Sequence, residues 1–151
     1  MKAITLTQPW ATLVAIGAKR IETRSWSTAY RGPLAIHAAK TFPKDARDLC
    51  RDLYPGAALF SSVLIAAGYD RIAQIPLGVV VATCELVAVK RIIPGYIKVL
   101  RDQMGHFNSE QEIAFGDYTP GRYAWILADV RSLDAPIPAK GALGLWEWSE
   151  R

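Results

Sequence analysis

Apolar and polar residues alternate with two different periods along this chain, and the two periods predict short strands interleaved with short helices. A weak alternation over residues 2–6 predicts a first strand. Helical spacing follows at Trp10, Leu13, Val14 and Gly17. Thr7 is expected to cap this helix, Pro9 suits its first turn, and Gly17 supplies a left-handed stop. The first helix therefore ends where a charged segment begins.

That segment, GAKRIETRSW at residues 17–26, leads directly into a second predicted strand. The two-residue period of a strand places four side chains on one face: Arg20, Glu22, Arg24 and Trp26. Ile21 and Thr23 are expected to face the core, and Lys19 stands at the start of the strand. One strand face is thus predicted to carry a carboxylate between two guanidinium groups.

Three further strands are predicted over residues 34–39, 78–92 and 123–130. The strand at 78–92 is apolar on both faces, which is typical of a strand covered on both sides. Glu85 lies within it, and a carboxylate there is costly unless it is paired or hydrogen-bonded. Glu85 is therefore a candidate functional residue.

Helices are predicted between these strands. Residues 41–56 favour an amphipathic helix that ends at a Pro-Gly pair, and residues 57–77 are helical or irregular. A short helix is expected around residues 96–104. Ser109 with Glu112 three residues later predicts a capping box for another helical turn.

The interleaving of these elements is too irregular for repeated βαβ units and predicts an α+β fold. We expect a small curled sheet or barrel with short helices around it. At 151 residues the chain has the size of one domain, predicted to span residues 1–151. A hydrophobic content of 51% with 21% charged residues indicates a globular chain.

Several classes of protein are disfavoured by missing motifs. The signatures of P-loop NTPases, dinucleotide oxidoreductases, elbow-type serine hydrolases and zincins do not occur. Cys50 and Cys84 have no metal or redox spacing and are expected to be free, buried thiols. His37 and His106 have no neighbouring ligand set, so we expect no metal and no cofactor.

The N-terminal apolar run is short and interrupted by polar residues, unlike a signal peptide. No stretch approaches the roughly 18 to 20 apolar residues that a membrane span needs. We therefore expect a soluble, cytoplasmic protein with no membrane partner, and we favour a monomer.

Basic residues are concentrated in the first third of the chain. Residues 1–51 carry nine Lys or Arg against three acids, whereas residues 52–151 carry nine against eleven. This asymmetry predicts a positive face for an anionic partner such as nucleic acid or a nucleotide. A solvated charged surface without a partner is the alternative.

Residues 17–24 resemble the Gly-x-Lys-x-x-Glu-x-Arg signature of the ASCH domain family, with Lys19, Glu22 and Arg24 at its charged positions. The flanking LTQPWATLVAI, the segments YRGPLAIHAAK and KGALGLWEW, and the central strand with Glu85 also look like their ASCH counterparts. The resemblance implies a PUA-like fold, a small mixed β-barrel with several short helices packed around it. It also implies a cleft between the first helix, the signature strand and the central strand, and a role with RNA or nucleotides.

The candidate ligand contacts of that cleft combine cations and aromatic rings. The cations suited to phosphate groups are Lys19, Arg24, Arg31 and Lys40. The rings suited to base stacking are Trp10, Trp26 and Tyr123, and His37 completes the set. We therefore expect RNA, a nucleotide or a modified nucleoside as the partner.

A small hydrolase is the alternative to a binding module. Some ASCH members are similar to this chain but act as amidohydrolases on acetylated cytidine, through a lysine, a threonine three residues later and a distant glutamate. The resemblance then implies Lys19 as general base and Glu85 as the glutamate, but Glu22 occupies the threonine position. These three residues are the candidate catalytic groups, for acetylcytidine-type or RNA phosphodiester substrates. A third alternative is a protein-interaction domain that binds acidic peptide in the same cleft.

Overall fold

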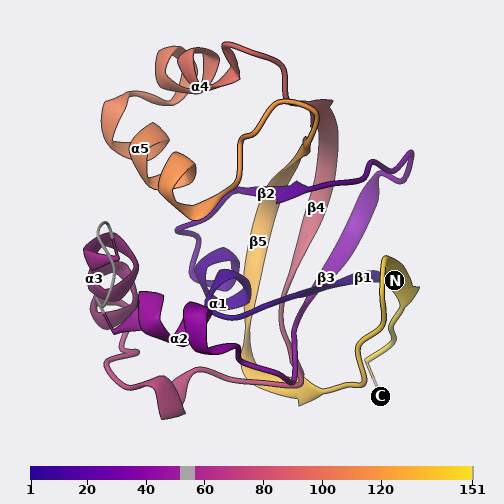
Figure 1. Cartoon of the computed structure of the whole chain (residues 1–151). Helices are drawn as coiled ribbons and strands as arrows, with labels where there is room; N and C mark the ends of the chain where they lie inside the picture. The colour runs from indigo at the N-terminus through magenta and orange to yellow at the C-terminus, as the bar shows by residue number, and fades with distance from the viewer. Residues whose placement is uncertain (52–56, 151) are drawn as a thin grey trace.

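The computed structural model describes residues 1–51 and 57–150, in which six strands form one sheet (Figure 1). The strands are β1 (Lys2–Leu6), β2 (Ile21–Arg24), β3 (Gly32–Ala38), β4 (Val79–Arg91), β5 (Tyr123–Pro138) and β6 (Leu145–Glu147). From edge to edge their order is β2-β5-β4-β3-β1-β6. β1 and β3 run parallel, and the other neighbours run antiparallel. This mixed, curled sheet with helices around it confirms the predicted α+β fold.

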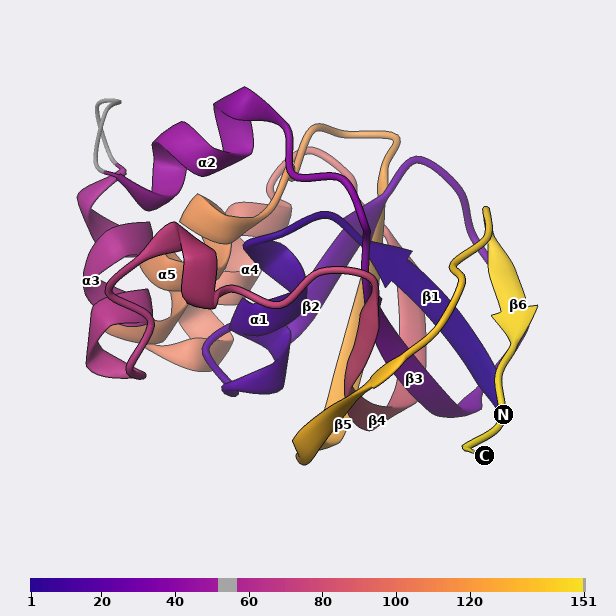
Figure 2. The same cartoon turned by 90° about the horizontal axis from the view of Figure 1, so that it is seen from below.

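Helices cover one side of this sheet, as Figure 2 shows. They are α1 (Trp10–Ala15), α2 (Lys44–Cys50), α3 (Ala58–Ala66), α4 (Tyr96–Met104) and α5 (His106–Phe115), with a 3-10 turn over Ile72–Gln74. α1 contacts β1, β3, β4 and β5. Its Ala11 and Val14 belong to the same buried cluster as Trp125 and Leu127 of β5. The main core therefore lies between the sheet and the helix that precedes the charged segment.

The start of α1 differs from the prediction that Thr7 caps it. No threonine cap forms, and the fully buried Gln8 side chain accepts the Thr12 backbone N–H at 2.9 Å instead. The amide nitrogen of Gln8 also donates to the Pro76 carbonyl at 2.8 Å. The Gln8 side chain thus holds both the start of α1 and the segment that leads to β4. The side chain of a threonine is too short to reach both. The predicted stop at Gly17 is confirmed by its φ of 79°.

The strands β1 to β5 begin close to where the alternation predicts them, but β6 was not predicted, and β5 runs beyond the expected end at residue 130 to Pro138. The second half of β5 pairs with the first half of β4 through several register shifts. Its side chains are mostly exposed, so the alternation that marks a half-buried strand is missing there. α2 ends at Cys50, and the predicted Pro-Gly helix end at residues 55–56 lies outside the described residues.

Glu112 does not form the predicted capping box. α5 begins at His106, so Ser109 and Glu112 both lie inside the helix. The Glu112 carboxylate accepts the backbone N–H of Arg20 at 2.5 Å and that of Ile21 at 3.1 Å. Burial raises the pKa of Glu112, and the hydrogen bond from Arg20 opposes that shift. One carboxylate therefore fixes the start of β2 against α5.

Glu112→Ala is expected to lower the free energy of unfolding by about 2–4 kcal/mol, because two largely buried backbone N–H groups lose their acceptor. Urea denaturation followed by circular dichroism measures this change. Glu150→Ala removes an exposed carboxylate near the C-terminus and is the matched control, with an expected change below about 0.5 kcal/mol. Equal values for the two variants would show that Glu112 does not hold β2.

Candidate functional site

A pocket of about 300 Å³ opens between β2, an edge strand of the sheet, and the chain that leaves β1. It is lined by Thr7 and Trp10, by Glu22, Thr23 and Arg24 of β2, and by residues 114–117 at the end of α5. Among the described residues β2 pairs with β5 and not with β1. This hollow, called here the Glu22 pocket, therefore lies where the sheet does not close on itself.

Glu22 brings a largely buried carboxylate to the pocket, with 8% of the residue exposed. Its Oε1 accepts the backbone N–H of Thr23 at 2.8 Å and lies 3.8 Å from Lys19 Nζ. Lys19 is fully buried, donates to the Ile21 carbonyl, and is not among the lining residues. Lys19 thus balances the charge of Glu22 from inside the protein and does not reach the pocket space.

The loop after α5 forms another wall and packs closely on Thr23. Thr23 Oγ1 accepts the backbone N–H of Asp117 at 2.9 Å. A Cβ on Gly116 would lie 2.7 Å from the Tyr118 ring and 3.2 Å from Thr23 Cγ2, so this approach requires glycine. Thr23 is buried as predicted, and it also contributes to the pocket lining.

Arg24 joins the Glu22 pocket to a larger hollow of about 1080 Å³. Arg24 and Thr7 line both hollows, and the larger one also takes in Lys40, Lys140 and the rest of the segment 138–144. We call this larger hollow the Lys40 groove. Two of the predicted phosphate contacts, Arg24 and Lys40, are thus brought to one surface.

His37 lies at the Lys40 groove, but both of its ring nitrogens have partners within the protein. Nε2 donates to the Ala139 carbonyl at 2.9 Å, and Nδ1 lies 3.1 Å from Thr5 Oγ1. The residue is 2% exposed, and burial lowers its pKa against the opposing effect of the Ala139 hydrogen bond. His37 therefore anchors the segment after β5 and has no nitrogen left for a ligand.

Neither Glu85 nor Tyr123 lines these two hollows. Glu85 lines a separate small pocket with Asp129 and Arg131. Tyr123, at the start of β5, pairs with Arg24 of β2 in the sheet, but it is not among the residues that line either hollow. The fold thus does not bring Glu85 to the carboxylate of Glu22.

Trp26 and Arg31 are engaged by the loop between β2 and β3 and line neither hollow. The Trp26 ring meets Trp125 edge-on at 4.8 Å between centroids, and the Trp26 carbonyl accepts the Trp125 indole N–H at 3.2 Å. Arg31 donates to the carbonyls of Thr28 and Tyr30 at 2.8 and 2.7 Å. Both side chains stabilise the local structure.

Two contributors to the site were not predicted from the sequence. Glu112 is buried in α5 together with Ser109 and Phe115. An acidic residue at a buried position of a helix is unusual, and this was the signal in the sequence that could have pointed to it. Lys140 follows β5 in a glycine-rich segment, and nothing in its spacing indicates that the segment returns to β1.

Two observations concern possible metal ligands and the two thiols. The structurally described part of the chain holds no group of three His, Cys, Asp or Glu that could bind a metal ion. Burial raises the pKa of Cys50 to about 11 and that of Cys84 to about 12, so both thiols are protonated at neutral pH. Each helix in residues 1–51 and 57–150 is too short or too polar to cross a bilayer.

The sequence of this chain is similar to a known protein family. The ASCH domain model matches residues 4–137. Activating signal cointegrator 1 of Homo sapiens is 48% identical over 44 residues, which make up 28% of this chain and only 8% of that protein.

Solved structures agree on the fold. The crystal structure of ASCH from Zymomonas mobilis gives a TM-score of 0.54 at 14% identity and covers 99% of this chain and 87% of that chain. A mutant form of that protein gives a TM-score of 0.52 at 14% identity, with 99% and 90% covered. At this identity the likeness shows the fold, and it confirms the ASCH-type architecture that the signature implied.

The neutral His37 is expected to make stability depend on pH. Its pKa is lowered in the folded state, so below about pH 6.5 the unfolded chain takes up a proton that the folded protein excludes. The free energy of unfolding should therefore fall as the pH falls from 6.5 through the lower folded value. Urea denaturation at several pH values, for the wild type and for His37→Gln, measures this contribution as the difference between the two curves. Parallel curves would mean that His37 titrates equally in both states.

Proposed function

The chain belongs to the ASCH domain family, and from that premise we propose that it binds RNA, with a base in the Glu22 pocket and a phosphate on Arg24. The observation that carries the proposal is the placement of Arg24, which lines both the acidic pocket and the cationic groove. A guanidinium group binds phosphate oxygens in a bidentate manner. A nucleotide carries both groups that this arrangement suits: a phosphate for the Arg24 guanidinium and a base for the acidic pocket.

The pocket itself has groups that suit a nucleobase. Glu22 Oε1 accepts the Thr23 backbone N–H, and no hydrogen bond to Oε2 occurs among the described residues. A carboxylate oxygen can accept a hydrogen bond from the exocyclic amino group of cytosine. Trp10 lines the pocket while it packs edge-on against Phe60 at 6.1 Å. An aromatic wall of this kind contributes about 1–3 kcal/mol per base in single-strand binders.

Binding is better supported than hydrolysis. A general base must present a lone pair to the substrate. Lys19 Nζ is fully buried, donates to the Ile21 carbonyl, lies 3.8 Å from Glu22 Oε1 and does not reach the pocket. Glu85, the other candidate catalytic group, lines a different pocket. We therefore argue for a binding module, and turnover of RNA or N4-acetylcytidine during the binding assays would contradict it.

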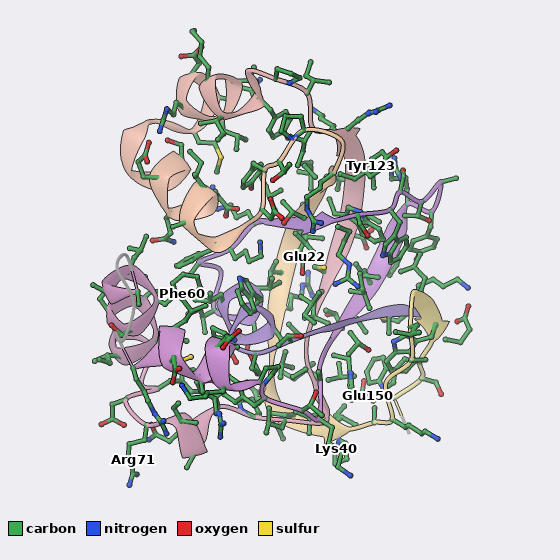
Figure 3. All side chains as sticks on the ribbon, viewed as in Figure 1. Glu22, Lys40, Phe60, Arg71, Tyr123 and Glu150 are labelled. Atoms are coloured by element: carbon green, nitrogen blue, oxygen red, sulfur yellow. The ribbon has the colours of Figure 1, made fainter. Side chains whose placement is uncertain are left out.

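Arg24→Ala is expected to weaken binding of single-stranded RNA about tenfold at low salt and to reduce the salt slope by about 0.7, the value for one lost phosphate contact. Fluorescence anisotropy at several salt concentrations measures both effects. Arg71→Ala is the matched control, because Arg71 is exposed and lies away from Glu22 in Figure 3. The absence of any RNA binding by the wild type at low salt would overturn the proposed function.

Glu22→Gln is expected to reduce the preference for cytidine over uridine oligonucleotides. A carboxylate accepts hydrogen bonds but donates none, so it favours the amino group of cytosine over the carbonyl of uracil. The glutamine amide offers both N–H donors and a carbonyl acceptor, so the discrimination, about 1–3 kcal/mol for a good contact, should largely disappear. Competition between the two oligonucleotides measures it, with thermal melting as the check that the variant folds. An unchanged preference would place the base elsewhere.

A further inference from the structure

We propose that the Lys40 groove is a second nucleotide subsite, so that the ligand is a strand of RNA and not a free nucleotide. This inference depends on the proposed function of the Glu22 pocket. The groove adjoins that pocket at Thr7 and Arg24, which line both hollows. A strand with one base in the Glu22 pocket would pass Arg24 and lay its next nucleotide along the groove.

Charge is the first reason. The groove gathers Arg24, Lys40 and Lys140 from segments far apart in sequence, and no Asp or Glu lines it. None of these three has a carboxylate within ion-pair distance in the described part of the chain. Elsewhere, Lys2 and Lys98 each lie 2.7 Å from a carboxylate oxygen. Like charges around one hollow repel each other, and a bound phosphodiester relieves that repulsion.

Size and polarity are the second reason. The groove measures about 1080 Å³ against about 300 Å³ for the Glu22 pocket, which is far more than a phosphate group needs. Its lining includes Leu77, which is 39% exposed, and Leu143, which is 99% exposed. Cations beside uncovered apolar side chains match the mixed character of a nucleotide, with a charged phosphate and an apolar base face.

The segment that carries Lys140 is held in place by specific contacts. The Ala139 backbone N–H donates to the Gly78 carbonyl at 3.1 Å, and the Ala139 carbonyl accepts His37 Nε2 at 2.9 Å. A Cβ on Gly141 would lie 2.6 Å from His37 Cε1 and 2.8 Å from Thr5 Oγ1. Lys140 is therefore fixed between two anchored neighbours, and its backbone position over the groove is defined before any ligand binds.

An acidic peptide would also be attracted to these cations, but the adjoining pocket argues for RNA. The carboxylates of Glu22 and Asp117 line the Glu22 pocket and already have cations beside them, Lys19 and Arg122, so acidic side chains that continue from the groove would find no unpaired cation there beyond Arg24. A base carries no negative charge and offers amino groups to those carboxylates. The combination of a cationic groove and an acidic pocket thus fits alternating phosphates and bases better than a run of carboxylates.

The test compares cytidine 5′-monophosphate with a six-residue cytidine oligoribonucleotide, using calorimetry and anisotropy. The double variant Lys40→Ala/Lys140→Ala should bind the oligonucleotide about tenfold more weakly, lower its salt slope by about 1.4 for two phosphate contacts, and bind the monophosphate within about twofold of the wild type. Gly141→Ala changes no charge but displaces the Lys140 segment, so it should act in the same direction. Lys2→Ala/Lys98→Ala removes the same net charge outside both hollows and should leave both affinities unchanged.

The outcomes distinguish a failure of the second subsite from a failure of the proposed function. If the Lys40/Lys140 variant binds the oligonucleotide as the wild type does while monophosphate binding still requires Arg24, the second subsite is wrong and the proposed function stands. If neither probe binds at low salt, both are wrong. Tighter binding of hexa-aspartate than of the oligonucleotide, lost in the same variant, would overturn the subsite in favour of a peptide groove. Circular dichroism confirms that each variant is folded.

Discussion

The proposed binding surface depends on one buried carboxylate that holds a short edge strand in addition to its strand pairing. β2 has only four residues and lies at the edge of the sheet, so its ladder to β5 alone holds it weakly. The Glu112 carboxylate of α5 accepts two further hydrogen bonds, from the backbone N–H groups of Arg20 and Ile21 at the start of β2. Lys19 adds another from its own ammonium to the Ile21 carbonyl. The positions of Glu22 and Arg24 follow from this attachment, because both side chains project from the same short strand.

Opposite charges are separated across the surface that results. Carboxylates of Glu22 and Asp117 line the smaller hollow, whereas Lys40 and Lys140 line the larger one, and Arg24 belongs to both. The two carboxylates have cations of their own, since Glu22 Oε1 lies 3.8 Å from Lys19 Nζ and Asp117 Oδ2 lies 3.4 Å from Arg122 Nε. This division leaves the cations of the groove, and not the carboxylates of the pocket, without a charged partner among the described residues. It favours a ligand whose own charge alternates over the distance of one nucleotide. The modest net charge of +4 therefore understates how strongly cations are concentrated at one place.

The sequence pattern predicted most strands, the first helix and its stop at Gly17, because each is determined by local spacing and burial. It also placed Glu22 and Arg24 on one charged strand. It could not predict that Glu112 would cap a distant strand, because a helix-capping signal and a tertiary contact use the same residue types. His37 was expected to contact a ligand, but in the fold its ring nitrogens hold a loop. That contact forms only because the chain after β5 returns to β1. The spacing of apolar and polar residues in the sequence does not predict this return.

The charges of the signature have two separate physical tasks, and this explains why they occur so close together. Gly17 turns the chain sharply at positive φ, so Lys19 enters the interior directly after α1. A fully buried ammonium is costly unless it has partners, and the Ile21 carbonyl and Glu22 supply them. Glu22 is thereby held in place at the wall of a pocket, with Oε1 between the Thr23 backbone N–H and Lys19 Nζ. Arg24, two residues further along the strand, has no carboxylate partner among the described residues, and its guanidinium lies over the Trp26 ring at 5.7 Å from the ring centroid. A strand that carries its own buried counter-ion can present a fixed carboxylate beside a guanidinium that rests on an aromatic ring and has no carboxylate partner among the described residues.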